Sequence, residues 1–180
     1  MLLRRFSFAA SLALLAGTAS AQTMEFGCPK PGTAFTFDSG ATMTARSQDG
    51  MDCLMQKTGG PAVKVRALLF DNPGPDGKDT SAFIAAIKPE RLWPLQVGKK
   101  IEASYGTWTY VLTVARFEKR MGPGDALFDA FVIEMNEQGD GGERSVSRWW
   151  VSPVENYALR YDFSNGAGGA NRAVVTSIKH

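Results

Sequence analysis

Runs in which apolar and polar residues alternate, separated by turn residues, fill most of the chain after residue 33. In the clearest run, 107–117, every second side chain is large and apolar: Trp108, Tyr110, Leu112 and Val114. Successive side chains of a strand point to opposite faces, so this pattern predicts a strand that buries one face. Asp49-Gly50 between two such runs predicts a hairpin.

The pattern predicts about nine or ten strands, over 34–38, 41–47, 51–56, 62–70, 99–105, 107–117, 128–135, 143–151, 156–163 and 172–178. One short helix is expected at 82–87, because Asp79-Thr80-Ser81 can cap it and Pro89 ends it. Sequential hairpins favour an antiparallel sheet, and a sheet of this size must curl, split or close. We therefore expect a mainly β fold with a curved antiparallel sheet, a half-barrel or open barrel with the helix plugging one side. A two-sheet sandwich is the alternative.

The first 21 residues have the three parts of a secretory signal. Arg4 and Arg5 precede an apolar run at 6–17, and Ala19-Ser20-Ala21 supplies small residues for cleavage. The run is too short for a membrane-spanning helix, which needs about 20 residues. We expect Sec-type export, cleavage after Ala21, and a single β-rich domain at 22–180. This domain would be periplasmic or secreted, with no transmembrane anchor after cleavage.

The chain contains two cysteines, Cys28 and Cys53. An exported chain meets oxidising conditions, so we expect them to form a disulfide. A redox pair or a metal site is the alternative, but zinc sites use closer ligand spacings. Loss of the signal removes two arginines and no acid, which leaves basic and acidic residues equal in number. Without a basic cluster, the chain is not expected to bind nucleic acid or an anionic membrane surface.

Histidine chemistry is excluded, because the single histidine is the last residue, His180. No other histidine can activate a serine or cysteine nucleophile or build a His-rich metal site. The glycine-rich stretch 166–169 lacks the βαβ context of a dinucleotide site. We therefore expect no metal and no cofactor.

Carboxylate catalysis needs only two acidic side chains, provided that burial keeps one of them protonated. Their spacing does not single out a pair among the available residues, which are Glu118, Asp129, Glu134 and Glu155. We expect these four residues at strand ends and on solvent-facing surfaces.

Aromatic side chains gather in the C-terminal two thirds of the chain. They serve either as core packing or as the wall of a ligand site in a curved sheet. Adjacent Trp149 and Trp150 on one strand must point to opposite faces. If both are buried, the sheet is covered on both sides; if one is exposed, it marks a binding surface. The candidate ligand-binding residues are Trp93, Trp108, Tyr110, Trp149, Trp150, Tyr157 and Tyr161.

Three segments of the C-terminal half resemble segments of uncharacterised bacterial periplasmic or secreted proteins with a curved antiparallel sheet. They are WPLQVGKK at 93–100, GPGDALFDAFVIE at 122–134 and RWWVSPVENYALRYDF at 148–163. The chain departs from the family pattern at Trp150, where the family often has tyrosine, and at Leu127 beside Phe128. The resemblance implies a fold and a location outside the cytoplasm, and it brings no catalytic residues.

Three hypotheses of function follow. The leading one is a non-enzymatic periplasmic module that binds an apolar small molecule or an envelope component, or that assists the envelope. The second is a structural or interaction protein that docks a partner through a sheet edge or through the Trp149/Trp150 surface. The third is a carboxylate-dependent hydrolase, in which burial creates an acid/base pair.

Overall fold

The computed structural model describes residues 22–74 and 76–180. The predicted signal at 1–21 lies outside these residues. In the part of the chain that is described, no helix is long and apolar enough to cross a membrane.

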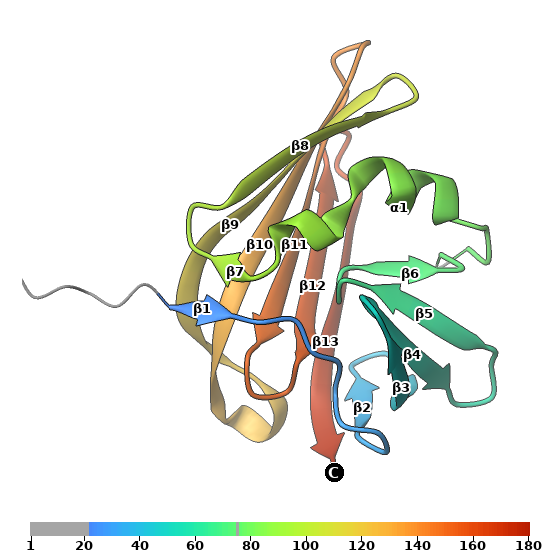
Figure 1. Ribbon diagram of the computed structural model, residues 1–180, viewed down its shortest axis with the longest axis vertical. Coiled ribbons are helices and arrows are strands. Elements are labelled where there is room, and N and C mark those ends of the chain that lie inside the picture. Colours follow the sequence, from blue (N-terminus) through green and yellow to red (C-terminus); the bar gives the residue numbers. More distant parts are fainter. Residues whose placement is uncertain (1–21, 75) are drawn as a thin grey trace, which may run out of the picture.

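Most of the chain forms one antiparallel sheet of eleven strands, and Figure 1 shows how they are arranged. In chain order these are β2 (Ala34–Phe37), β3 (Thr42–Asp49), β4 (Asp52–Lys57), β5 (Ala62–Arg66), β6 (Phe70–Asn72), β8 (Lys100–Tyr105), β9 (Trp108–Met121), β10 (Leu127–Gly139), β11 (Arg144–Ser152), β12 (Tyr157–Asn165) and β13 (Ala170–Lys179). Their spatial order is β6-β5-β4-β3-β2-β13-β12-β11-β10-β9-β8. β1 (Thr23–Met24) and β7 (Leu95–Gln96) form a separate two-stranded ribbon. The expected antiparallel sheet is confirmed, and one large sheet takes the place of the alternative sandwich.

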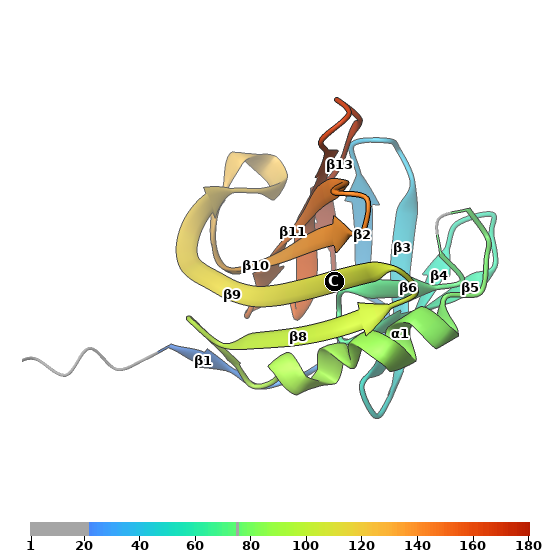
Figure 2. The same cartoon turned by 90° about the horizontal axis from the view of Figure 1, so that it is seen from above.

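The sheet curls into a half-barrel that does not close (Figure 2). Register shifts in the β9–β10, β11–β12 and β3–β4 pairs bend the strands, as β-bulges do. Helix α1 (Ser81–Ile87) lies between the two edge strands, β6 and β8. Phe83 on α1 packs on Phe70 of β6 and on Tyr105 of β8, with ring centroids 5.5 and 5.7 Å apart. The helix therefore bridges the open side of the half-barrel, as expected.

Local signals fix both ends of α1. At its start, the Asp79 carboxylate accepts a hydrogen bond from the Ser81 amide at 2.8 Å. At its end, Lys88 adopts a left-handed conformation with φ 53° and donates its amide proton to the Ile84 carbonyl. Pro89 then begins a short 3-10 helix, η1 (Pro89–Leu92). The helix buries Ile84 and Ile87 against the sheet.

The expected strand at 62–70 is wrong, because the chain turns in its middle. Ala67 and Leu68 have φ values of 53° and 62°, and they separate β5 from β6. Turns with positive φ usually contain glycine, asparagine or aspartate. Both side chains are buried. In the sequence the apolar residues of this turn therefore look like a continuation of the strand, and the hydrophobic pattern does not show the turn.

The concave face of the sheet holds the main hydrophobic core. Alternation along β9 is confirmed, since Leu112 and Val114 are fully buried while Thr109 is exposed. Trp149 and Trp150 are both buried, with exposed fractions of 6% and 3%. Trp149 belongs to the concave core, and Trp150 belongs to a second cluster on the convex face. The sheet is therefore covered on both sides at this point.

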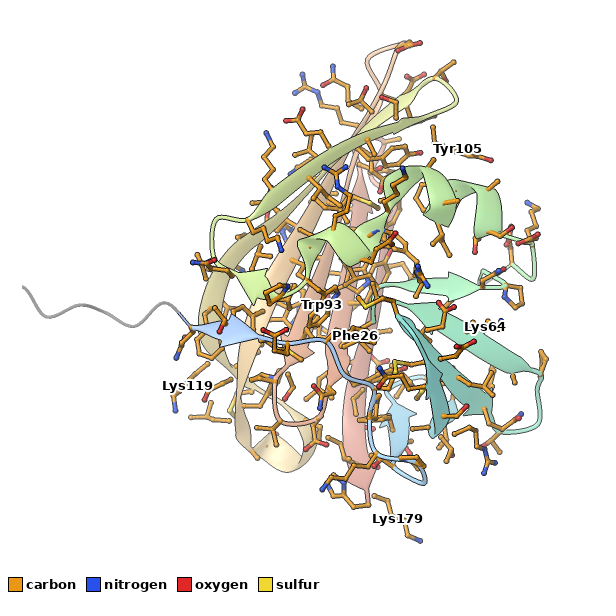
Figure 3. All side chains as sticks on the ribbon, in the orientation of Figure 1. Phe26, Lys64, Trp93, Tyr105, Lys119 and Lys179 are labelled. Atoms are coloured by element: carbon orange, nitrogen blue, oxygen red, sulfur yellow. A yellow bond between two sulfur atoms is a disulfide. The ribbon has the colours of Figure 1, made fainter. Side chains whose placement is uncertain are left out.

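Cys28 and Cys53 form the expected disulfide, with Cα atoms 5.5 Å apart. The bond attaches the N-terminal segment 22–28 to β4. In the same segment, Phe26 packs edge-on against Trp93, with ring centroids 5.2 Å apart (Figure 3).

Strand β13 changes its neighbour halfway along its length. Residues 170–174 pair with β12. Pairing with β2 begins only at Val175 and continues to Lys179. The centre of the sheet is therefore built from the first and last of its eleven strands in the sequence.

Candidate functional site

Polar side chains gather on the concave face near the tips of the β10–β11 and β12–β13 hairpins. Ser147 Oγ on β11 lies 3.4 Å from Glu137 Oε1 on β10 and 3.4 Å from the Tyr161 hydroxyl on β12. Ser145 directly opposes Glu137 across the β10–β11 pair and is buried. We call Asp71, Glu137, Ser145, Ser147 and Tyr161 the concave polar cluster.

Glu137 is a carboxyl group without a basic partner. Burial raises its pKa, and hydrogen bonds with Ser145 and Ser147 offset part of this rise. None of the ion pairs formed by residues 22–74 and 76–180 includes Glu137. The group therefore holds its proton to a higher pH than an ordinary glutamate.

Asp71 enters the cluster from the edge strand β6. It opposes Val65 across the β5–β6 pair, and directly opposed residues share a face of the sheet. Val65 is a buried core residue, so Asp71 faces the concave side. Asp71 is exposed to solvent on one side, yet the neighbouring protein desolvates its carboxyl group and raises the pKa to about 6.

The carboxyl group of Asp71 has no hydrogen-bond or ion-pair partner in the described part of the chain, where only its backbone carbonyl accepts a bond, from Thr80. Its negative charge reaches two tyrosines of β12. Burial raises the pKa of Tyr157 and of Tyr161, and the charge of Asp71 raises both further. Glu137 acts on Tyr161 in the same direction. Tyr161 is thus the side chain within electrostatic reach of both carboxyl groups.

Aromatic rings surround the concave polar cluster. Trp149 lies 5.4 Å from Tyr161 and 5.6 Å from Phe70, measured between ring centroids. Phe83 of α1 packs on Tyr110 at 5.2 Å. The cluster therefore combines hydrogen-bonding groups with an apolar, aromatic wall.

Four of the seven candidate residues, namely Tyr110, Trp149, Tyr157 and Tyr161, belong to these surroundings. The other three lie elsewhere. Trp93 packs on the N-terminal segment, and its buried Nε1 has no partner within residues 22–74 and 76–180. Trp108 is half-buried at the tip of the β8–β9 hairpin.

Trp150 lies in a charged network on the convex face. Its Nε1 donates a hydrogen bond to Glu118 at 2.7 Å. The guanidinium carbons of Arg120 and Arg160 lie 5.1 and 4.8 Å from its ring centroid. Burial alone would raise the pKa of Glu118, but hydrogen bonds from Arg116 and Trp150 outweigh it and lower the pKa. Trp150 is buried and bonded to residues of the same chain, and Trp149 is buried too. Neither Trp149 nor Trp150 therefore forms an exposed binding surface.

The four carboxylates singled out in the sequence lie outside the concave polar cluster. Glu118 and Glu134 share Arg116 on the convex face, at 2.6 and 2.9 Å. Asp129 and Glu155 each lie within ion-pair distance of a Lys or His side chain. These residues are thus engaged in surface contacts.

Sequence reasoning missed Asp71, Glu137, Ser145 and Ser147. A signal existed for Glu137, because it continues the alternation of β10 two residues beyond the buried Met135. Asp71 gave no signal, since the turn before it is apolar and the segment after it is rich in proline and glycine.

Within residues 22–74 and 76–180, no three His, Cys, Asp or Glu side chains are grouped to hold a metal ion. Comparison with protein-family models, with curated proteins and with solved structures finds no match for this chain. The inference of function therefore rests on the geometry of the concave face. Asp71, whose pKa is raised to about 6, can exchange a proton near neutral pH, and both Asp71 and Glu137 can accept hydrogen bonds.

Proposed function

We propose that the protein is a non-enzymatic, exported binding module. It holds a small, largely apolar ligand with a hydrogen-bond-donating group on the concave face of the half-barrel. The observation that carries the proposal is the unpaired carboxyl group of Asp71 beside the aromatic rings of the concave face.

The concave polar cluster lowers the free energy of unfolding, and this supports a functional role for it. A polar or charged group among apolar side chains destabilises the fold unless it is paired. A strand that required only packing would carry an apolar residue at the partly buried position of Glu137. Carboxyl groups with raised pKa values in a concave site are typical of functional positions. Ligand sites are mostly apolar and contain a few polar groups that orient the ligand.

Export is supported by the Cys28–Cys53 disulfide, since disulfides persist in oxidising compartments. The ligand is then expected to be a small molecule or an envelope component outside the cytoplasm.

The test is a titration followed by tryptophan fluorescence, because Trp149 lies in the aromatic wall. The probes are dodecylamine and dodecanoate, which have the same chain length and opposite charges. We expect saturable binding of the amine at mildly alkaline pH and weaker binding of dodecanoate. Asp71→Asn and Glu137→Gln should each weaken amine binding about tenfold, or 1.4 kcal/mol.

Asp125→Asn is the matched control, because Asp125 is exposed in the turn between β9 and β10, at the opposite end of β10 from Glu137. It should bind the amine as the wild type does. The absence of a saturable change with either probe, or equal amine affinity of Asp71→Asn and wild type, would disprove the proposal.

A carboxylate-dependent hydrolase is the second candidate. It is favoured by the position of Tyr161 within electrostatic reach of both Asp71 and Glu137. Hydrolysis of p-nitrophenyl glycosides would support it if Asp71→Asn and Glu137→Gln each abolish the activity. Activity that persists in both variants would exclude these residues as the acid/base pair.

A further inference from the structure

The upper half of β13 forms an unpaired edge in the middle of the sheet. Residues 170–174 pair with β12 on one side, and β2 reaches only Val175 on the other side. Within the described chain, no strand pairs with the second side of residues 170–173.

The direction of the main-chain groups follows from Val174. Its amide donates to the Asp38 side chain, and its carbonyl accepts from the Asp38 amide, so both groups face the side of β2. Main-chain groups of a strand alternate between its two sides. The N–H and C=O groups of Arg172 and Ala170 therefore face away from β12, toward the unpaired side. The Asn165 amide donates a hydrogen bond to the Gly169 carbonyl, so the main-chain groups of Gly169 face β12. This agrees with the alternation, because Gly169 is one residue before Ala170.

The side chains along this edge differ on the two faces of the sheet. Asn171 opposes Phe163 and shares its face, while Arg172 opposes Asp162 on the convex face. Ala170, Asn171 and Arg172 are all exposed. Arg172 takes part in none of the ion pairs formed by the described residues, because Asp162 is bound by Arg160.

A surface depression adjoins the edge on the convex face. Ala170 and Ser164 are directly opposed in it, and Val146 opposes Ser164 on the next strand. These three side chains are small. Asp162 also lines the depression, together with Arg148 and Arg172, and its carboxylate is bound by Arg160.

We propose that this edge pairs with the same edge of a second copy of the chain. The two β13 strands run antiparallel around a twofold axis at Asn171, so that Asn171 opposes Asn171 of the partner subunit. Ala170 then opposes Arg172 of the partner subunit. Both members of this second pair face the edge, so they exchange both of their main-chain hydrogen bonds.

The edge is complementary to itself in this register. An asparagine amide contains a donor and an acceptor, so two opposed asparagines can bond to each other. The partner subunit's Arg172 stands opposite the small Ala170, so the depression leaves room for its side chain. A register shifted by two residues would instead place Arg172 opposite the partner subunit's Arg172, where like charges repel.

The paired edge is short, so the dimer is expected to be weak and to depend on protein concentration. Sedimentation velocity of the domain that begins at Gln22, over a wide range of concentrations, measures this directly. A rise in sedimentation coefficient with concentration supports the pairing. A monomer at every concentration would overturn it.

Arg172→Pro tests the main-chain bonds. Proline lacks an amide proton, and it is tolerated on an edge strand where the N–H faces solvent. The β12 pairing uses other main-chain groups, so circular dichroism should be unchanged. We expect this variant to remain monomeric. A folded Arg172→Pro variant that dimerises like the wild type would contradict the edge as the interface.

Asn171→Cys tests the register without loss of any main-chain group. Opposed residues that do not share hydrogen bonds have Cα atoms about 4.5 Å apart, which is within disulfide range. Mild oxidation should therefore join Asn171→Cys into a covalent dimer. Arg172→Cys is the matched control, because its two copies stand diagonally, beyond disulfide reach. Equal cross-linking of both variants, or none of Asn171→Cys, would reject the proposed register.

Discussion

Asp71 contributes a carboxyl group to the candidate site and, at neutral pH, lowers the stability of the folded protein. Asp71 is exposed, yet the surrounding protein desolvates its carboxyl group, and no ion pair of the described chain compensates it. The folded state therefore binds the proton of this group more tightly than the unfolded chain does.

Asp71→Asn is predicted to change stability in a pH-dependent way. The pKa rises from 3.8 to about 6 on folding. The stability of the wild type should therefore fall as pH rises through this range. At neutral pH the variant should be more stable by about 1 kcal/mol, because solvent contact screens most of the full effect. Below the lower pKa the two proteins should be equally stable.

Thermal unfolding across this pH range provides the measurement. A stability difference for Asp71→Asn that is the same at acidic and neutral pH would refute the desolvation argument.

Trp150→Phe is predicted to destabilise the protein by about 1–3 kcal/mol, through the lost hydrogen bond to Glu118 and weaker cation–π contacts. Urea denaturation measures the loss. Trp108→Phe should cost less, because Trp108 is only half-buried and donates no hydrogen bond in the described structure. Equal losses at both positions would mean that the convex network contributes little.

At the scale of elements, Lys88 terminates α1 in a conformation that normally favours glycine. Lys88→Gly is predicted to stabilise the protein by up to about 1 kcal/mol, since glycine removes the cost of a β-carbon at positive φ. Lys88 is exposed, so little packing is lost. Lys88→Ala retains the β-carbon and should give no gain. A gain for alanine equal to that for glycine, in urea denaturation, would exclude backbone strain as the cause.

The element pattern was readable from the sequence wherever one face of a strand is buried and the turns contain glycine. β9 and β10 followed from alternation, and α1 followed from its capping sequence and Pro89. The turn at Ala67-Leu68 could not be predicted, because its residues are apolar and normally avoid positive φ. The register between distant strands was also hidden, and it is the register that brings Asp71 close to Tyr161. For this reason aromatic members of the site were found from sequence, whereas its carboxyl groups were not.

At the scale of the whole molecule, the disulfide is predicted to contribute about 3 kcal/mol, because it closes a loop of this length in the unfolded chain. The double variant Cys28→Ala/Cys53→Ala should lose this amount in urea denaturation. Wild type treated with a reductant should unfold at the same urea concentration as the double variant. An unchanged midpoint in both cases would show that the segment 22–28 is held by packing alone.

The pairing of β2 with β13 also determines when, during synthesis of the chain, the sheet can be completed. A ribosome delivers β2 early and β13 late, yet these two strands join the two halves of the sheet. Contacts between residues so far apart in sequence form slowly, because a long loop must close first. The sheet cannot be completed until residue 179 has been synthesised. A chain that completes its sheet so late remains incompletely folded for longer, which is the state that the export proposed above would require.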